Sequence, residues 1–182
     1  LATGLLIVCT GKFTKQIDNF QGQDKVYIGS LHLGETTPSF DRETEVDNKF
    51  DISNITTEQL LSATHQFIGE IEQTPPRFSA VKIDGKRAFE YARKKDEVKI
   101  KSRIITIHEF KLLNHEPPEI DFLVSCSKGT YIRSLVNDFG KALNNGAYMS
   151  GLRRTSIGNY SVNDAYSVEE LKTKIHYQFQ QE

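Results

Sequence analysis

The sequence lacks the features that mark metal-binding, secreted or membrane-spanning proteins. Its 182 residues include only two cysteines, Cys9 and Cys126, with no Cys-x-x-Cys pair and no histidine cluster at ligand spacing. We therefore expect no metal, and we expect both thiols to be small buried side chains in a reducing compartment. The longest apolar run, Leu5 to Cys9, is far too short to span a bilayer and follows no basic leader. We expect a cytoplasmic protein without a membrane span or a signal peptide.

An excess of one charge is also missing, because the net charge is −1. The two signs are nevertheless unevenly spread. Arg77 to Arg103 holds ten basic and four acidic residues, whereas Gln16 to Pro76 holds eleven acidic and three basic residues. A basic block can follow the phosphates of a nucleic acid, or it can be an ordinary solvated face. Charge alone does not separate these two interpretations.

The most informative stretch is a predicted junction between a strand and a helix. The strand is indicated by alternating apolar positions, at Ile120, Phe122, Val124 and Cys126. The helix is indicated by apolar residues at helical spacing, at Ile132, Leu135, Val136, Phe139 and Leu143. Gly129 permits a sharp exit from the strand, and Thr130 is a candidate N-cap.

Tyr131 and Arg133 then fall in the first helical turn, where a phenol and a guanidinium could face an anion or a base. The plainer alternative is a core tyrosine and a surface arginine.

Several elements are predicted before this junction. A buried strand is expected over Gly4 to Thr10, a short helix from Lys12 to about Phe20, and a strand from Lys25 to Leu33. In the last of these strands, Tyr27 faces away from Val26 and Ile28. The polar, acidic stretch from Gly34 to Asp51 is expected to be a surface loop.

Other elements are predicted from capping and turn signals. Thr56-x-x-Gln59 has the form of a capping box, as does Ser167-x-x-Glu170 before the last helix. Arg87 to Lys94 predicts a short helix. Glu97 to Leu113 predicts a long, bent strand, and Ala147 to Asn159 predicts two short strands. Helices interspersed with strands joined by turns or hairpins indicate an α+β fold with a mixed, largely antiparallel sheet and flanking helices.

The stretch Lys128-Gly129-Thr130-Tyr131-Ile132-Arg133 resembles the signature of the TruB family of tRNA pseudouridine synthases. Further stretches agree with the family in order: residues 1–6 (Leu-Ala-Thr-Gly-Leu-Leu), 24–27 (Asp-Lys-Val-Tyr), 76–82, 85–93 and 152–154 (Leu-Arg-Arg). The resemblance covers nearly the whole chain. It implies the pseudouridine synthase fold, with residues 1–182 forming one catalytic domain that is incomplete at the N-terminus and lacks a C-terminal PUA domain.

The resemblance also implies a reaction. The family isomerises uridine 55 in the T-loop of tRNA to pseudouridine, without metal or organic cofactor. Such an enzyme needs a carboxylate nucleophile, a ring that holds the flipped base, and a cation that orients the carboxylate. In the family the nucleophile is an Asp in Leu-Asp-Pro, directly before Leu-Ala-Thr-Gly. Because the sequence starts at Leu1-Ala2-Thr3-Gly4, that Asp is expected two residues before Leu1, and residues 1–182 alone are expected to be inactive. None of Asp24, Asp41 and Asp138 stands in the right context to replace it.

The supporting residues of the family have counterparts in this sequence. The resemblance assigns Arg133 to the nucleophilic carboxylate, whose pKa such a pair lowers by roughly 1–3 units. It assigns Tyr27 to stacking on the flipped uracil. It assigns further residues to substrate binding: Tyr131 and Leu152 in the uracil pocket, with Lys128, Arg153 and Arg154 beside them. Without the resemblance, Tyr27 and Leu152 would be interpreted as core residues, and the two arginines could meet phosphates or only solvent.

The expected partner is therefore the T-loop of tRNA, with no membrane and no metal, and the expected state is a monomer. The turn after the Tyr27 strand departs from many relatives, reading Thr-Thr-Pro-Ser-Phe-Asp over residues 36–41, so we expect different loop contacts to RNA there. Two other functions stay open. One is a non-catalytic RNA-binding or tRNA-folding module of the same fold. The other is an unrelated α/β domain that binds a small anion at the turn from Gly129 to Arg133.

Overall fold

The computed structural model describes residues 2–94, 96 and 98–179. One large sheet organises them, in the order β1–β10–β2–β9–β8–β5, with β11 paired to β10. Its strands are β1 (Ala2–Gly4), β2 (Lys25–Leu33), β5 (Gly69–Gln73), β8 (Arg103–Leu112), β9 (Glu119–Cys126), β10 (Ala147–Ile157) and β11 (Tyr160–Ser161). All neighbouring pairs are antiparallel except β1 with β10. The predicted α+β fold with a largely antiparallel sheet is confirmed.

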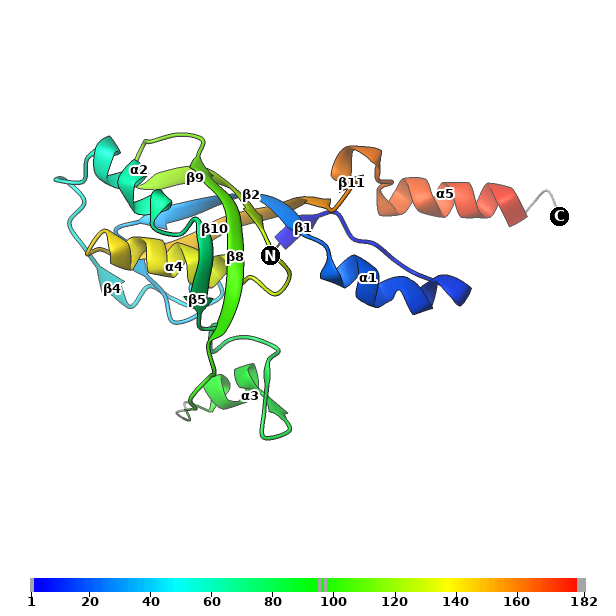
Figure 1. Cartoon of the computed structure of the whole chain (residues 1–182), viewed down its shortest axis with the longest axis horizontal. Helices are drawn as coiled ribbons and strands as arrows, with labels where there is room; N and C mark the ends of the chain where they lie inside the picture. Colours follow the sequence, from blue (N-terminus) through cyan, green and yellow to red (C-terminus); the bar gives the residue numbers. More distant parts are fainter. Residues whose placement is uncertain (1, 95, 97, 180–182) are drawn as a thin grey trace.

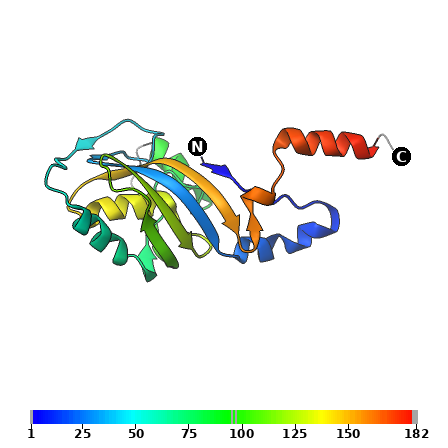
Figure 2. The same ribbon diagram turned by 90° about the horizontal axis from the view of Figure 1, so that it is seen from above.

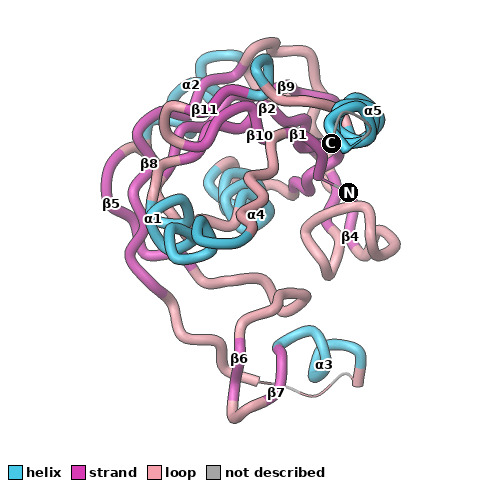
Figure 3. Tube along the Cα trace, turned by 90° about the vertical axis from the view of Figure 1, so that its right-hand side faces the viewer, coloured by secondary structure: helices cyan, strands magenta, loops and turns pink. Residues whose placement is uncertain are grey.

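Two helices cover one face of this sheet and form the core with it. They are α2 (Thr57–His65) and α4 (Ile132–Ala142), and Figure 3 shows α4 inside the curve of the strands. A single cluster of buried side chains joins them to the sheet, with Leu60 from α2, Phe139 from α4, and Phe122 from β9 among its members. This face holds the main apolar core. Each such buried side chain contributes roughly 1.5–3 kcal/mol to the free energy of unfolding.

The alternation in β2 determines which residues face α4. Leu31 and Leu33 are buried, whereas Ile28 is 40% exposed on the other face. Tyr27 shares the inward face with Leu31 because successive side chains of a strand point to opposite faces. The prediction that Tyr27 and Ile28 lie on different faces is confirmed, and Tyr27 packs against the buried core.

The remaining elements lie around this sheet. Two-residue strands form the pairs β3 (Glu35–Thr36) with β4 (Asn48–Lys49) and β6 (Lys82–Ile83) with β7 (Lys86–Arg87). Shorter helices are η1 (Gly11–Gln16), α1 (Ile17–Gly22), α3 (Ala88–Arg93), η2 (Val162–Asp164) and α5 (Val168–Phe179). Figures 1 and 2 show α1 and α5 extending from the same end of the sheet. Both predicted capping boxes are confirmed, at Thr56–Gln59 and Ser167–Glu170.

The described residues between β5 and β8 (74–94, 96 and 98–102) form an arm that leaves the sheet and carries β6, β7 and α3 (Figures 1 and 3). It holds most of the basic block. The predicted helix over Arg87 to Lys94 is confirmed as α3. The strand predicted from Glu97 to Leu113 is confirmed only as β8, from Arg103 to Leu112, and Glu97 itself lies outside the described residues.

Two strand predictions are wrong. The strand expected over Gly4 to Thr10 ends at Gly4, because β11 folds back and pairs with Ser156 and Ile157 at the edge of β10 that a longer β1 would need. The two strands expected after Ala147 are one strand, since register shifts after Met149 and after Arg154 let β10 stay paired with β2. Each bulge interrupts the alternation that a sequence pattern relies on.

Two further predictions are wrong in part. The stretch from Gly34 to Asp51 is not only a surface loop, because Thr37, Ser39 and Asp41 are buried within it. Cys126 is buried as expected, whereas Cys9 is only half-buried. Among the helices of the described part of the chain, none is long and apolar enough to cross a membrane.

Candidate functional site

The corner between β9 and α4 is built around a glycine. Gly129 has φ +82, a conformation that L side chains rarely adopt, and an added Cβ would lie 3.4 Å from the guanidinium carbon of Arg103. Thr130 is not the N-cap, contrary to prediction. Its hydroxyl donates to the Ser127 carbonyl at 2.9 Å, and Tyr131 occupies the N-cap position without a side-chain cap. The corner is therefore held by contacts from elsewhere in the fold.

Arg133, in the first turn of α4, joins three separate segments. Its Nη1 donates to Asp41 Oδ2 at 2.9 Å and to the Ser39 carbonyl at 3.3 Å. Its Nη2 donates to the Phe78 carbonyl at 2.8 Å. The two side chains of the ion pair are only 18% and 13% exposed, so the pair is weakly screened compared with a surface pair. Arg133 thus ties α4 to the loop after β2 and to the base of the arm.

Asp41 is the residue of this group that the sequence did not nominate. It lies 92 positions before Arg133 in a polar stretch without periodicity. Its backbone carbonyl accepts hydrogen bonds from Thr37 Oγ1 and Ser39 Oγ, and its carboxylate also accepts from the Glu43 N–H. These contacts hold the carboxylate in place, and no spacing along the chain pointed to them.

Tyr27, Leu152 and Arg154 meet on the inward face of the sheet. Tyr27 of β2 is the register partner of Arg154 of β10, and Gly29 is the partner of Leu152. Burial raises the pKa of the Tyr27 phenol, although a hydrogen bond with Arg154 opposes part of that shift. The phenol therefore stays protonated at neutral pH and can act as a hydrogen-bond donor.

The N-terminal strand reaches the same place. Ala2 and Gly4 of β1 are the register partners of Leu152 and Arg154. Arg154 donates from Nε and Nη2 to the Leu5 carbonyl at 2.8 and 2.7 Å. Arg154 consequently links Tyr27 on one side of β10 to the first residues of the chain on the other.

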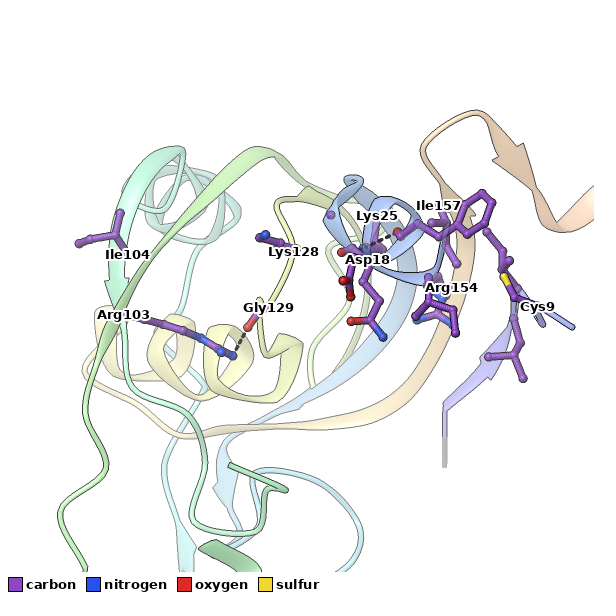
Figure 4. A pocket seen from close by; sticks show the side chains of 15 residues that line it. Cys9, Asp18, Lys25, Arg103, Ile104, Lys128, Gly129, Arg154 and Ile157 are labelled. Carbon is purple, nitrogen blue, oxygen red and sulfur yellow. Dashed lines mark hydrogen bonds between the residues drawn. The ribbon is translucent and has the colours of Figure 1, made fainter. Parts of the chain in front are cut away.

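A pocket of about 830 Å³ opens beside these residues (Figure 4). We call it the basic pocket because four cations line it, Lys25, Arg103, Lys128 and Arg154, against one carboxylate, Asp18. Apolar side chains such as Phe20 and Ile104 supply the rest of its wall. Its size suits one or two nucleotide-sized groups, and its charge suits an anionic ligand.

The cations of the basic pocket differ in how they are held. Lys25 Nζ donates to the carbonyls of Gln21 and Gln23 at 2.7 and 2.6 Å, and burial together with the nearby Arg154 lowers its pKa. Arg103 donates to the Gly129 carbonyl, as the dashed line in Figure 4 shows. Lys128 is exposed at the rim. The fixed cations set a positive potential, and Lys128 is placed to meet a ligand from solvent.

The predicted site residues thus fall into two adjoining groups and one outlier. Tyr27, Leu152 and Arg154 share the inward face of the sheet, Arg154 lines the basic pocket, and Lys128 lies on its rim. Tyr131 and Arg133 stand on the corner, with Arg133 directed toward Asp41. Arg153 is exposed, and its register partner is the outward-facing Ile28, so it lies on the opposite face of the sheet from Tyr27. The roles of all seven residues remain predictions.

Comparison with solved structures identifies the class of fold. The fold is shared with a chain in the crystal structure of a Cbf5–Nop10–Gar1 complex, at a TM-score of 0.69 and 23% identity, over 97% of this chain and 43% of that one. Together with the family match of residues 1–132, this likeness confirms the pseudouridine synthase fold that the sequence predicted.

Sequence comparison then gives the family. Residues 1–132 match the model of the TruB family pseudouridylate synthase N-terminal domain, and residues 133–182 match that of the tRNA pseudouridylate synthase B C-terminal domain. The tRNA pseudouridine synthase B of Flavobacterium johnsoniae is 54% identical over 92% of this chain and 73% of its own length. That of Phocaeicola vulgatus is 52% identical over 94% of this chain and 73% of its own length. The chain belongs to the TruB family of pseudouridylate synthases.

Proposed function

We propose that the protein is a tRNA pseudouridine synthase that converts uridine 55 of the T-loop to pseudouridine. The observation that carries this proposal is the clustering of residues from the family-like stretches at one end of the sheet. Arg154 and Lys128 line the basic pocket, Tyr27 is the register partner of Arg154, and Tyr131 follows Gly129 of the pocket wall by two residues. Relatives that bear the name tRNA pseudouridine synthase B share about half of the residues over nearly the whole chain.

The reaction exchanges one bond of the nucleoside for another. The bond between C1′ of the ribose and N1 of uracil breaks, the base turns, and C1′ bonds to C5 instead. C5 loses its hydrogen as a proton, and N1 gains one, so no redox partner is required. We propose that the chain performs this without metal or organic cofactor, using a carboxylate as the nucleophile.

In our proposal that carboxylate is the family Asp, two residues before Leu1. It stands three positions before Ala2, so it can lie at most about 10 Å from that residue along the chain. Ala2 pairs with Leu152, which supports a position for the carboxylate beside the uracil pocket. Arg133 would orient the carboxylate and keep it ionised. We propose that residues 1–182 without this carboxylate are inactive.

Binding of the flipped base is assigned to the inward face of the sheet. Extruding a base costs a few kcal/mol, and stacking on an aromatic ring returns about 1–3 kcal/mol. Tyr27 supplies that ring, with Tyr131 and Leu152 closing the pocket. Lys128, Arg154 and the exposed Arg153 are proposed to meet RNA phosphates, which position the strand without reading its sequence. We further propose that the protein acts as a monomer in the cytoplasm.

The test uses a protein that extends upstream of Leu1 through the Leu-Asp-Pro stretch, incubated with unmodified tRNA. Release of the C5 hydrogen of uridine measures the reaction, and sequencing of the product locates the modified base. We expect pseudouridine at position 55, and loss of it when the upstream Asp is changed to Asn. Modification at another position would reject the assigned substrate site.

The alternative from a different class is a non-catalytic RNA-binding or tRNA-folding module. It would be favoured if the encoded residues before Leu1 contained no Asp in this context. It would also be favoured if the longer protein bound tRNA and accelerated its folding without forming pseudouridine.

A further inference from the structure

We propose that Gln73 and Arg103 are positioning residues that fix Tyr131, and through it the first turn of α4, in the geometry that pseudouridine formation needs. This inference rests on the proposed function. Neither residue belongs to the family-specific stretches of the sequence, and both come from strands at the far side of the sheet from Tyr27.

Gln73 holds the main chain of Tyr131. Its Oε1 accepts from the Tyr131 N–H at 2.8 Å, and its Nε2 donates to the Tyr131 carbonyl at 3.1 Å. The glutamine is only 1% exposed, and a buried amide of this kind is retained where its hydrogen bonds are satisfied. Tyr131 is the N-cap residue of α4, and its own side chain caps no helical N–H. Gln73 takes the place of the Glu or Gln of a capping box, whose side chain accepts from the N–H of the N-cap residue.

Arg103 holds the ring of the same tyrosine. Its guanidinium carbon lies 4.9 Å from the centroid of the Tyr131 ring, within the range of a cation–π contact. It also donates to the carbonyl of Gly129, two residues earlier in the corner. The glycine makes this approach possible, since a side chain there would crowd the guanidinium.

The two residues act from the same place in the sheet. Gln73 is the last residue of β5 and Arg103 the first of β8, and they are direct register partners. Directly opposed residues of an antiparallel pair project from the same face. One cross-strand pair therefore constrains both the peptide and the ring of Tyr131, and Arg133 follows two residues later on the same helical turn.

The Gln73–Arg103 pair would affect the rate of the chemical step more than the affinity for tRNA. A displacement of about 1 Å in a positioning group can lower a rate by about 100-fold, whereas phosphate contacts supply most of the affinity for RNA. Arg103 already donates to Gly129 and covers one face of Tyr131, so in this proposal its guanidinium is a support for the tyrosine and touches no reacting atom.

The test compares three variants of the protein that includes the segment before Leu1. Gln73→Met keeps the length of the side chain and removes both hydrogen bonds. Arg103→Lys keeps the charge and removes the planar guanidinium from the ring. Ser134→Ala is the matched control, because Ser134 is just as buried and its Oγ donates to the Thr74 carbonyl at 2.8 Å and not to Tyr131.

We expect Gln73→Met and Arg103→Lys to lower the single-turnover rate by about 10- to 100-fold, with the Kd for tRNA changed less than about threefold. Ser134→Ala should lower the melting temperature about as much as Gln73→Met and keep a rate near wild type. If all three variants lose rate in proportion to their stability, the role of the pair is only structural and the proposal is wrong.

Hydrogen exchange of the Tyr131 amide, measured without RNA, separates this inference from the proposed function. We expect faster exchange in Gln73→Met than in Ser134→Ala. An unchanged exchange rate in Gln73→Met would overturn the inference even in an active enzyme. A wild-type protein that forms no pseudouridine, with Tyr131 still held by Gln73, would instead overturn the proposed function and leave the pair without a reaction to serve.

Discussion

Arg133 shows how one side chain serves several contacts in this protein. Its guanidinium meets the Asp41 carboxylate and the carbonyls of Ser39 and Phe78. A lysine could not reproduce this fork of donors, since its ammonium is a single point charge. In the proposed function the same arginine orients the nucleophilic carboxylate, and these contacts would hold the guanidinium in place before any substrate binds.

In the protein that includes the preceding segment, Arg133→Ala should reduce pseudouridine formation by about 100-fold or more, because the nucleophile and the loop after β2 would lose their common partner. Arg42→Ala is the control, since Arg42 is 56% exposed and meets Glu119 only at 3.5 Å. Turnover measured at saturating tRNA checks the prediction, and near-normal turnover of Arg133→Ala would refute the assigned role.

The two thiols should differ in reactivity. Burial raises the pKa of Cys126 to about 11, with a smaller opposing effect from Thr130, whereas Cys9 is only half-buried. At pH 8, iodoacetamide should modify Cys9 and leave Cys126 unmodified until the protein unfolds. Equal rates for the two thiols in the native protein would contradict this.

The raised pKa of Cys126 also predicts a pH dependence of stability. The folded state binds the thiol proton more tightly than the unfolded chain, whose thiols titrate near pH 8.5. The corresponding stabilisation is present below that pH and is lost as the pH rises toward 11, at up to about 1.4 kcal/mol per pH unit. Urea unfolding between pH 8 and 11 measures it, and the decline should be shallower in Cys126→Ala.

At the scale of elements, the corner between β9 and α4 depends on a glycine in a left-handed conformation. Gly129→Ala should destabilise the protein by about 1–2 kcal/mol and should also displace Arg103, 3.4 Å from the added methyl group. Gly85→Ala is a matched control, because Gly85 has φ +83 in the arm and an added methyl group there meets nothing within 4 Å.

The two alanine variants should therefore lose similar stability, while only Gly129→Ala loses turnover, by about tenfold or more. Thermal unfolding and single-turnover kinetics on the same samples give both quantities. Equal turnover in the two variants would show that the corner tolerates displacement of Arg103.

At the scale of the whole molecule, the sheet carries the proposed chemistry and the arm carries exposed cations such as Lys82 and Lys86. Arg133 connects the two by its hydrogen bond to Phe78. If the arm follows RNA phosphates, Lys86→Ala should weaken tRNA binding and reduce the slope of log K against log salt by about 1. Lys172→Ala on α5 should change neither quantity, because Lys172 is exposed and its ion pair is with the neighbouring Glu169 of the same helix. An unchanged slope for Lys86→Ala would mean that the arm is a solvated face.

Local patterns were sufficient where each element depends on its own residues. The alternation of β2 placed Tyr27 on the core face, both capping boxes began their helices, and the strand and helix around Gly129 appeared where predicted. Sequence patterns failed to predict the length of a strand where the neighbouring strand determines it. β10 continues through two register shifts because β2 lies beside it, and β1 stops at Gly4 because β11 occupies the edge.

The sequence by itself determined the fold class, the family and the corner that presents Tyr131 and Arg133. Only the tertiary structure decided what holds that corner: Gln73 reaches Tyr131 across 58 positions and Asp41 reaches Arg133 across 92. No periodicity encodes such pairs, because a buried amide or carboxylate gains its partner only when distant strands and loops pack together. Local residue order sets which face a side chain takes, and the packing of the sheet sets what that side chain meets.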